Sequence, residues 1–134
     1  MIARIFQGLA WVVVSGLVLE FYLAGAALFG VTTFQYHRAL GVRLAAAILL
    51  LMVVALITRP GRRVVGLAAL LAALAIVQVF LPSLRTGVPS VAAIHVVNAL
   101  ALAVVAFSIA RVPTQSGEAR DSRRELRVAA ERSR

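Results

Sequence analysis

The chain has 134 residues, is 62% hydrophobic and only 14% charged, and has a mean hydropathy of +0.97. Soluble domains carry about 25% charged residues, so this composition excludes an ordinary soluble fold and predicts an integral membrane protein. The formal net charge of +9 does not indicate nucleic-acid binding, because the arginines flank apolar segments and follow the rules of membrane topology.

Four apolar segments follow one another along the chain. They cover residues 9–31, 34–58, 64–81 and 90–110. Each has roughly the 20 residues that a helix needs to cross a hydrocarbon core about 30 Å thick, and only helical backbone satisfies its own polar groups there. Breaks containing proline separate the last three segments. We predict an all-α fold, an integral membrane antiparallel four-helix bundle formed by residues 1–112.

The first segment also has features of a secretory signal peptide. Arg4 precedes the apolar stretch, and Ala24-Gly25-Ala26 mimics a cleavage site. The stretch is longer than a typical signal core, however, and it contains Glu20. A retained membrane helix is therefore the preferred interpretation.

The distribution of arginines predicts the orientation. Eleven of the 14 lie on the side that holds the two termini and the second break, and only Arg38, Arg43 and Arg85 lie on the other side. Because arginine is enriched in cytoplasmic loops, we expect both termini in the cytoplasm and a location in the bacterial cytoplasmic membrane. Residues 113–134 are predicted to form a cytoplasmic Arg-rich tail, solvated because acids interrupt its basic residues.

The sequence contains no pattern of a soluble enzyme. It has no cysteine, no Gly-rich phosphate loop and no HExxH motif, and Glu20 is the only acid before residue 113. We therefore do not expect catalysis by the chain on its own. The functional candidates are the polar residues inside the apolar segments, namely Glu20, His37, Arg43, Gln78, His95 and Asn98.

Glu20 lies deep in the first apolar segment, where a lone charge costs several kcal/mol and is normally paired, protonated or part of a pathway. It follows Arg4 by 16 residues, and Arg43 precedes Arg59 by 16 residues. At 1.5 Å per residue both side chains lie about 24 Å from the cytoplasmic border. An intramembrane ion pair between Glu20 and Arg43 is the preferred hypothesis. A protonated, internally hydrogen-bonded Glu20 and a proton relay are the alternatives.

The two histidines enter the membrane from the same side. His37 follows Thr33 by four residues and His95 follows Ser90 by five, and both Thr33 and Ser90 are candidate helix caps. In an up-down bundle the second and fourth helices are diagonal partners, so two histidines at one depth can act as axial ligands of a low-spin haem. A count from the arginines at the cytoplasmic ends instead separates the histidines by about 9 Å in depth.

Neighbouring residues suit a haem b site with His37 and His95 as the metal ligands. Gly41, one turn from His37, leaves room for a flat macrocycle, and Arg38 and Arg85 are placed to bind the propionates, because guanidinium groups pair well with carboxylates. Two alternatives stay open. The histidines have a purely structural role near the helix ends, or they serve another ligand or a proton-transfer task.

The pattern F-[YF]-L-A-G, F-G and F-x-x-H-R-A-L-G, followed by H-x-x-N-A-L, occurs at residues 21–25, 29–30, 34–41 and 95–100. It resembles a family of small four-helix bacterial integral membrane proteins of unassigned function. The resemblance covers roughly residues 9–111 and implies the four-helix fold but no activity. More loosely, the chain is similar to small membrane cytochrome b subunits, which also place histidines near the ends of bundle helices.

Two functions of different kinds follow from the sequence. The preferred hypothesis is a small membrane b-type haem protein that relays electrons, with the haem held between two helices near the outer face. The alternative is a non-catalytic membrane subunit, without a cofactor, that docks onto a larger complex. The expected partners are the lipid bilayer and either a redox or other membrane-complex subunit or a second copy of the chain.

Overall fold

The computed structural model describes residues 2–112 and 131. It contains four long helices and a short 3₁₀ helix, in the order α1 (Ile2–Leu28), α2 (Phe34–Thr58), α3 (Arg62–Phe80), η1 (Leu81–Thr86) and α4 (Pro89–Ala110). Each long helix, α3 together with η1, is long and apolar enough to cross a membrane. The predicted all-α four-helix fold is confirmed, and the chain is a multi-pass membrane protein. Apart from Glu131, the predicted tail at residues 113–134 lies outside the described residues.

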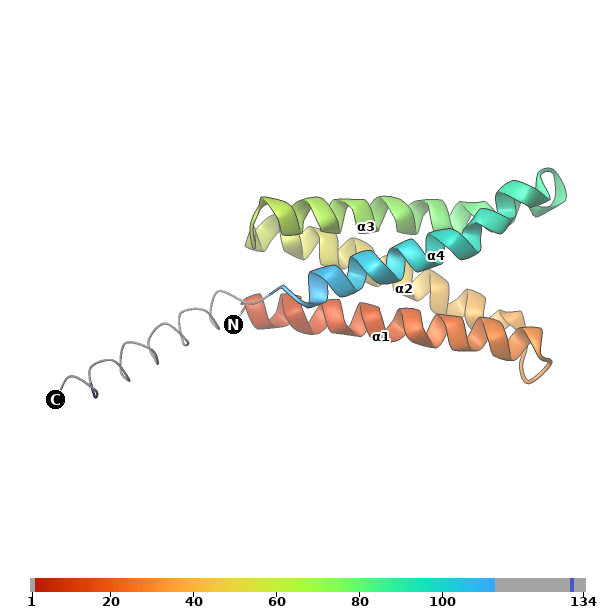
Figure 1. Cartoon of the computed structure of the whole chain (residues 1–134), viewed down its shortest axis with the longest axis horizontal. Helices are drawn as coiled ribbons and strands as arrows, with labels where there is room; N and C mark the ends of the chain where they lie inside the picture. Colours follow the sequence, from red (N-terminus) through yellow and green to blue (C-terminus); the bar gives the residue numbers. More distant parts are fainter. Residues whose placement is uncertain (1, 113–130, 132–134) are drawn as a thin grey trace.

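The four helices form an antiparallel bundle with short connections (Figure 1). Helix α1 packs against α2 and α4, and α3 packs against the same two helices. The diagonal partners are therefore α1 with α3 and α2 with α4, as predicted for an up-down bundle. The N-terminus and the α2–α3 connection lie at one end, and the α1–α2 connection and η1 lie at the other. We call this second end the distal end.

Local sequence explains where α1 and α2 end. Helix α1 begins earlier than predicted and ends before the predicted residue 31, because Gly30 adopts a left-handed φ of 74°. The Gly30 and Val31 N–H groups donate to the carbonyls of Ala27 and Ala26, which is the hydrogen-bond pattern of a glycine-terminated helix. Helix α2 ends at Thr58, its capping residue Arg59 is left-handed, and the proline that follows cannot continue a helix.

The start of α2 agrees with the prediction, and the start of α4 differs slightly. Thr33 precedes α2 in an extended conformation, as expected of the residue before a helix. Helix α4 begins at Pro89, so its capping residue is Val88 and the predicted cap at Ser90 is wrong. Proline is favoured in the first turn of a helix, where its missing N–H leaves no hydrogen bond unmade.

The apolar core fills the half of the bundle next to the N-terminus and the α2–α3 connection. Its largest fully buried side chains are Val13, Ile48, Leu51, Leu71 and Ile109, which come from all four helices. Many large apolar side chains on the outer faces are exposed, which suits contact with lipid. In the distal half the helices leave a cavity between them, lined by both polar and apolar side chains.

Candidate functional site

A cavity of about 1090 Å³ occupies the distal half of the bundle and is lined by residues from all four helices and η1. Its polar lining residues are Glu20, His37, Arg38, Gln78, Ser83, Arg85, Thr86 and His95. Leucine, alanine, phenylalanine and other apolar residues form the remaining walls. A largely apolar cavity with a few convergent polar groups is the usual form of a small-molecule or cofactor site.

His37 and His95 meet inside this cavity. They lie on the diagonal helices α2 and α4, and their rings contact each other edge to face, with 6.3 Å between centroids and 79° between planes. This contact agrees with the depth estimate made from the helix starts and not with the estimate made from the opposite helix ends. The structure therefore brings together the two residues that the sequence predicts as a pair.

The Nδ1 atom of each imidazole contacts an oxygen acceptor. His37 Nδ1 pairs with Glu20 Oε2 and lies 3.3 Å from the Glu20 backbone oxygen. His95 Nδ1 lies 3.2 Å from the backbone oxygen of Gln78. Since these partners are acceptors, they assign the proton to Nδ1 in both rings and leave Nε2 as the nitrogen available to a ligand.

Gln78 and Asn98 extend this arrangement across α3 and α4. The side-chain nitrogen of Gln78 lies 3.3 Å from His95 Nε2, while Gln78 Oε1 accepts a hydrogen bond of 2.6 Å from Asn98 Nδ2. Asn98 also donates to the Leu74 carbonyl at 2.9 Å, and its side chain is buried. The three polar residues thus orient one another, and the sequence analysis assigns no role to Gln78 or Asn98. The spacing of three residues between His95 and Asn98 is the signal that places them on one helix face.

The predicted ion pair between Glu20 and Arg43 is wrong. Glu20 is buried and pairs with His37, whereas the Arg43 side chain is exposed on the outside of α2. Arg43 follows His37 by six residues, which rotates it about 120° around the helix axis away from His37. The depth count placed Glu20 and Arg43 at one level, but depth carries no information about which way a side chain points.

The second carboxylate oxygen of Glu20 has no partner. Oε1 is buried and makes no hydrogen bond. Gly41 lies beside it, since a Cβ atom built on Gly41 would be 3.5 Å from Oε1. Gly41 also lines the cavity, so its missing side chain keeps open space next to the carboxylate.

Arg38 and Arg85 line the same cavity from α2 and η1. Both side chains are exposed at the distal end, and no carboxylate of the described residues pairs with either. Within residues 2–112 and 131, no three His, Cys, Asp or Glu side chains are placed to hold a metal ion together. The cavity therefore provides two imidazoles, of His37 and His95, as nitrogen ligands, and the guanidinium groups of Arg38 and Arg85 lie at its distal end.

A protein-family model matches residues 20–86, which is half of the chain, and its description is a family of unknown function (DUF6220). The match contains His37, Gly41 and the predicted motif elements between residues 21 and 41, whereas the H-x-x-N-A-L element that contains His95 lies beyond it. No curated protein and no solved structure matches the chain.

Proposed function

The chain belongs to the DUF6220 family of unknown function, and from its site we propose that it is a small membrane electron-transfer protein that holds a b-type haem between His37 and His95. One observation carries this proposal. Two imidazoles from diagonal helices meet in a cavity, and each is held through Nδ1 so that Nε2 is the nitrogen offered to a ligand. The contact of His95 Nε2 with Gln78, at 3.3 Å, is long for a hydrogen bond and easily exchanged.

The available ligands suit a haem better than a bare metal ion. Two imidazoles complete the axial coordination of a low-spin haem, whose macrocycle supplies the other four nitrogens. A bare ion would need further protein ligands, and the described residues provide no cluster of three. Histidine ligands commonly bind a carboxylate or a backbone carbonyl through their other nitrogen, which are the partners of His37 and His95 here.

The walls of the cavity also fit this group. Apolar side chains form much of the wall around the histidines, and Arg38 and Arg85 supply guanidinium groups for two carboxylates near the distal end. When bound, a haem supplies reversible one-electron transfer. If His37 and His95 both served as its ligands, the haem would supply electron transfer and not oxygen chemistry, so the proposed role is an electron relay and not an oxidase.

The proposal includes a location and an orientation. We place the chain in a bacterial cytoplasmic membrane with both termini in the cytoplasm and the distal end outside. The described arginines support this, because Arg4, Arg59, Arg62, Arg63 and Arg111 lie towards the end of the bundle that carries the N-terminus. A haem held there would pass its electron to a redox subunit or a carrier in the membrane.

The visible spectrum of the purified protein tests the proposal. The full chain, produced in haem-replete cells and purified in detergent, is expected to show sharp low-spin bands on reduction. His37→Ala and His95→Ala should each weaken these bands, and Gln35→Ala, at an exposed position on the same helix as His37, should not. A colourless protein with an intact helical fold would contradict the proposal and favour a cofactor-free subunit that docks onto a larger complex.

A further inference from the structure

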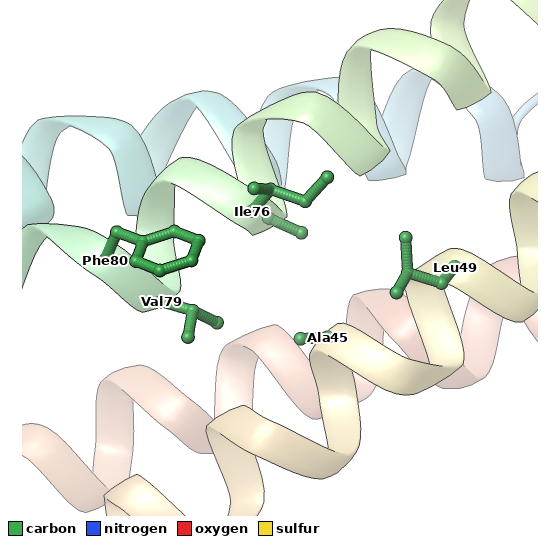
Figure 2. Close-up of a pocket in the computed structure, with 6 residues that line it drawn as sticks. Ala45, Leu49, Ile76, Val79 and Phe80 are labelled. Atoms are coloured by element: carbon green, nitrogen blue, oxygen red, sulfur yellow. The ribbon is translucent and has the colours of Figure 1, made fainter.

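An apolar groove of about 150 Å³ runs between α2 and α3 on the outside of the bundle. Figure 2 shows Ala45 and Leu49 of α2 opposite Ile76, Val79 and Phe80 of α3. Ala75 completes the lining, which contains no polar residue. Leu49, Ile76, Val79 and Phe80 are exposed on the bundle surface, which faces lipid in a membrane-spanning chain. The groove is therefore open to the acyl chains.

This groove adjoins the central cavity. Ala45, Ala75 and Val79 line both. Two of the three shared residues are alanines, so only small side chains and Val79 lie between the two spaces. The groove and the cavity therefore adjoin at an apolar junction in the α2–α3 interface.

One face of α2 extends from Glu20 to this junction. Gly41, Ala45 and Leu49 follow one another at intervals of four residues, so they lie in a row along the helix. Gly41 borders the unpaired Oε1 of Glu20, Ala45 lies at the junction, and Leu49 lines the groove. The row therefore begins beside Glu20 Oε1, a buried acceptor without a hydrogen-bond partner, and ends at the lipid-facing groove.

We propose that the groove and the cavity together bind a lipid quinol. Its hydroxyl group donates to Glu20 Oε1, and its apolar tail leaves the bundle through the groove between α2 and α3. An unpaired buried carboxylate oxygen is costly and selects a ligand that carries a donor. It disfavours a fatty acid, because two carboxylates repel each other.

The choice of a quinol over other hydroxyl-bearing lipids rests on the proposed function, since an electron relay inside a membrane needs a lipid-soluble electron carrier. The proposal requires the cavity to hold the quinol head group beside the haem. The cavity of about 1090 Å³ exceeds the range of roughly 300–1,000 Å³ that is usual for a pocket with one small molecule.

Binding of short-tailed quinols to the purified full chain tests this inference. A decyl-tailed benzoquinol is expected to bind about tenfold more tightly than the matching quinone, because only the quinol has a donor for Glu20. Glu20→Gln should remove this preference, since a side-chain amide offers both a donor and an acceptor. Equal affinities of quinol and quinone for the unchanged protein would overturn the proposal.

The groove is tested with a pair of variants on α2. Ala45→Leu fills the junction and should weaken the decyl-tailed quinol about tenfold while leaving a tailless quinol unaffected. Ala46→Leu, at the exposed neighbouring position that lines neither space, is the control and should change neither affinity. If Ala45→Leu and Ala46→Leu bind the tailed quinol alike, the groove does not hold the tail and the proposal fails.

The haem spectrum is recorded on the same samples before the titration, which separates the two proposals. Quinol binding by a colourless protein would overturn the haem and support the quinol site. A protein with low-spin haem bands that binds no quinol would overturn this inference alone.

Discussion

The side chains of Glu20 of α1 and His37 of α2 are paired within the membrane-spanning part of the bundle. The Glu20 side chain is only 11% exposed and that of His37 is 26% exposed. The pair joins two neighbouring helices and orients the His37 ring towards His95. The Glu20 carboxylate therefore has two roles. Through Oε2 it positions His37, a proposed haem ligand, and its Oε1 has no hydrogen-bond partner.

The first prediction concerns the energy of this pair. Glu20→Gln alone and His37→Gln alone should each destabilise the bundle more than the two changes made together. Each single change leaves one buried group without its partner, whereas the double change removes both. We expect a coupling energy on the order of 1–3 kcal/mol in a double-mutant cycle, measured from unfolding in detergent.

The matched control for this cycle uses Arg43, which lies at a similar depth but is exposed. Glu20→Gln and Arg43→Leu should be additive, because the two side chains do not pair. Coupling between Glu20 and Arg43, with none between Glu20 and His37, would contradict the geometry of the site.

The second prediction concerns Asn98. Asn98→Leu removes the hydrogen bonds to the Leu74 carbonyl and to Gln78 Oε1, so it should cost about 1 kcal/mol of stability and loosen His95. Ser108→Ala is the control on the same helix, since Ser108 is exposed and bonds only to the Val104 carbonyl one turn away. Thermal unfolding in detergent measures the stability of both variants. Equal losses of stability would show that the hydrogen bonds of Asn98 contribute no more than the local bond of Ser108.

The third prediction concerns the close approach of α1 and α2 at Gly16. A Cβ atom at Gly16 would lie 2.6 Å from Leu44 Cδ1, whereas one at Gly8 meets nothing within 4 Å. Leu44 is buried, so Gly16→Val should destabilise the bundle by about 1–3 kcal/mol through overpacking, and Gly8→Val should cost much less. The comparison of their denaturation midpoints tests this, and a larger loss at Gly8 would be inconsistent with the packing.

The fourth prediction is the orientation. The chain has no cysteine, so single cysteines can be introduced without a background signal. Thr86→Cys, in the exposed part of η1, should react with an impermeant thiol reagent on intact cells, and Ser116→Cys, in the predicted tail, should react only after lysis. The reverse pattern of labelling would place the histidines on the cytoplasmic side.

Length and polarity along the chain determine most of the fold. Four apolar segments of membrane-spanning length, bounded by proline, glycine and arginine, predict the helices closely: α2 has the predicted bounds and α4 begins one residue early. The diagonal placement of α2 and α4 follows from short connections between successive helices. For the same reason the sequence predicts the pairing of His37 with His95, since both lie a few residues inside helices that start at the same end.

The partners of the polar side chains are decided only by the tertiary structure. A count along the sequence gives the depth of a residue in the membrane, and this was enough to suggest Arg43 as the partner of Glu20. It does not give the rotation of each helix about its own axis, which is set by how all four apolar faces pack together. That rotation turns His37 towards Glu20, turns Arg43 outward and brings Gln78 to His95. The cavity and the groove beside it are also decided at this level, because each is lined by residues of separate helices that only the packing brings together.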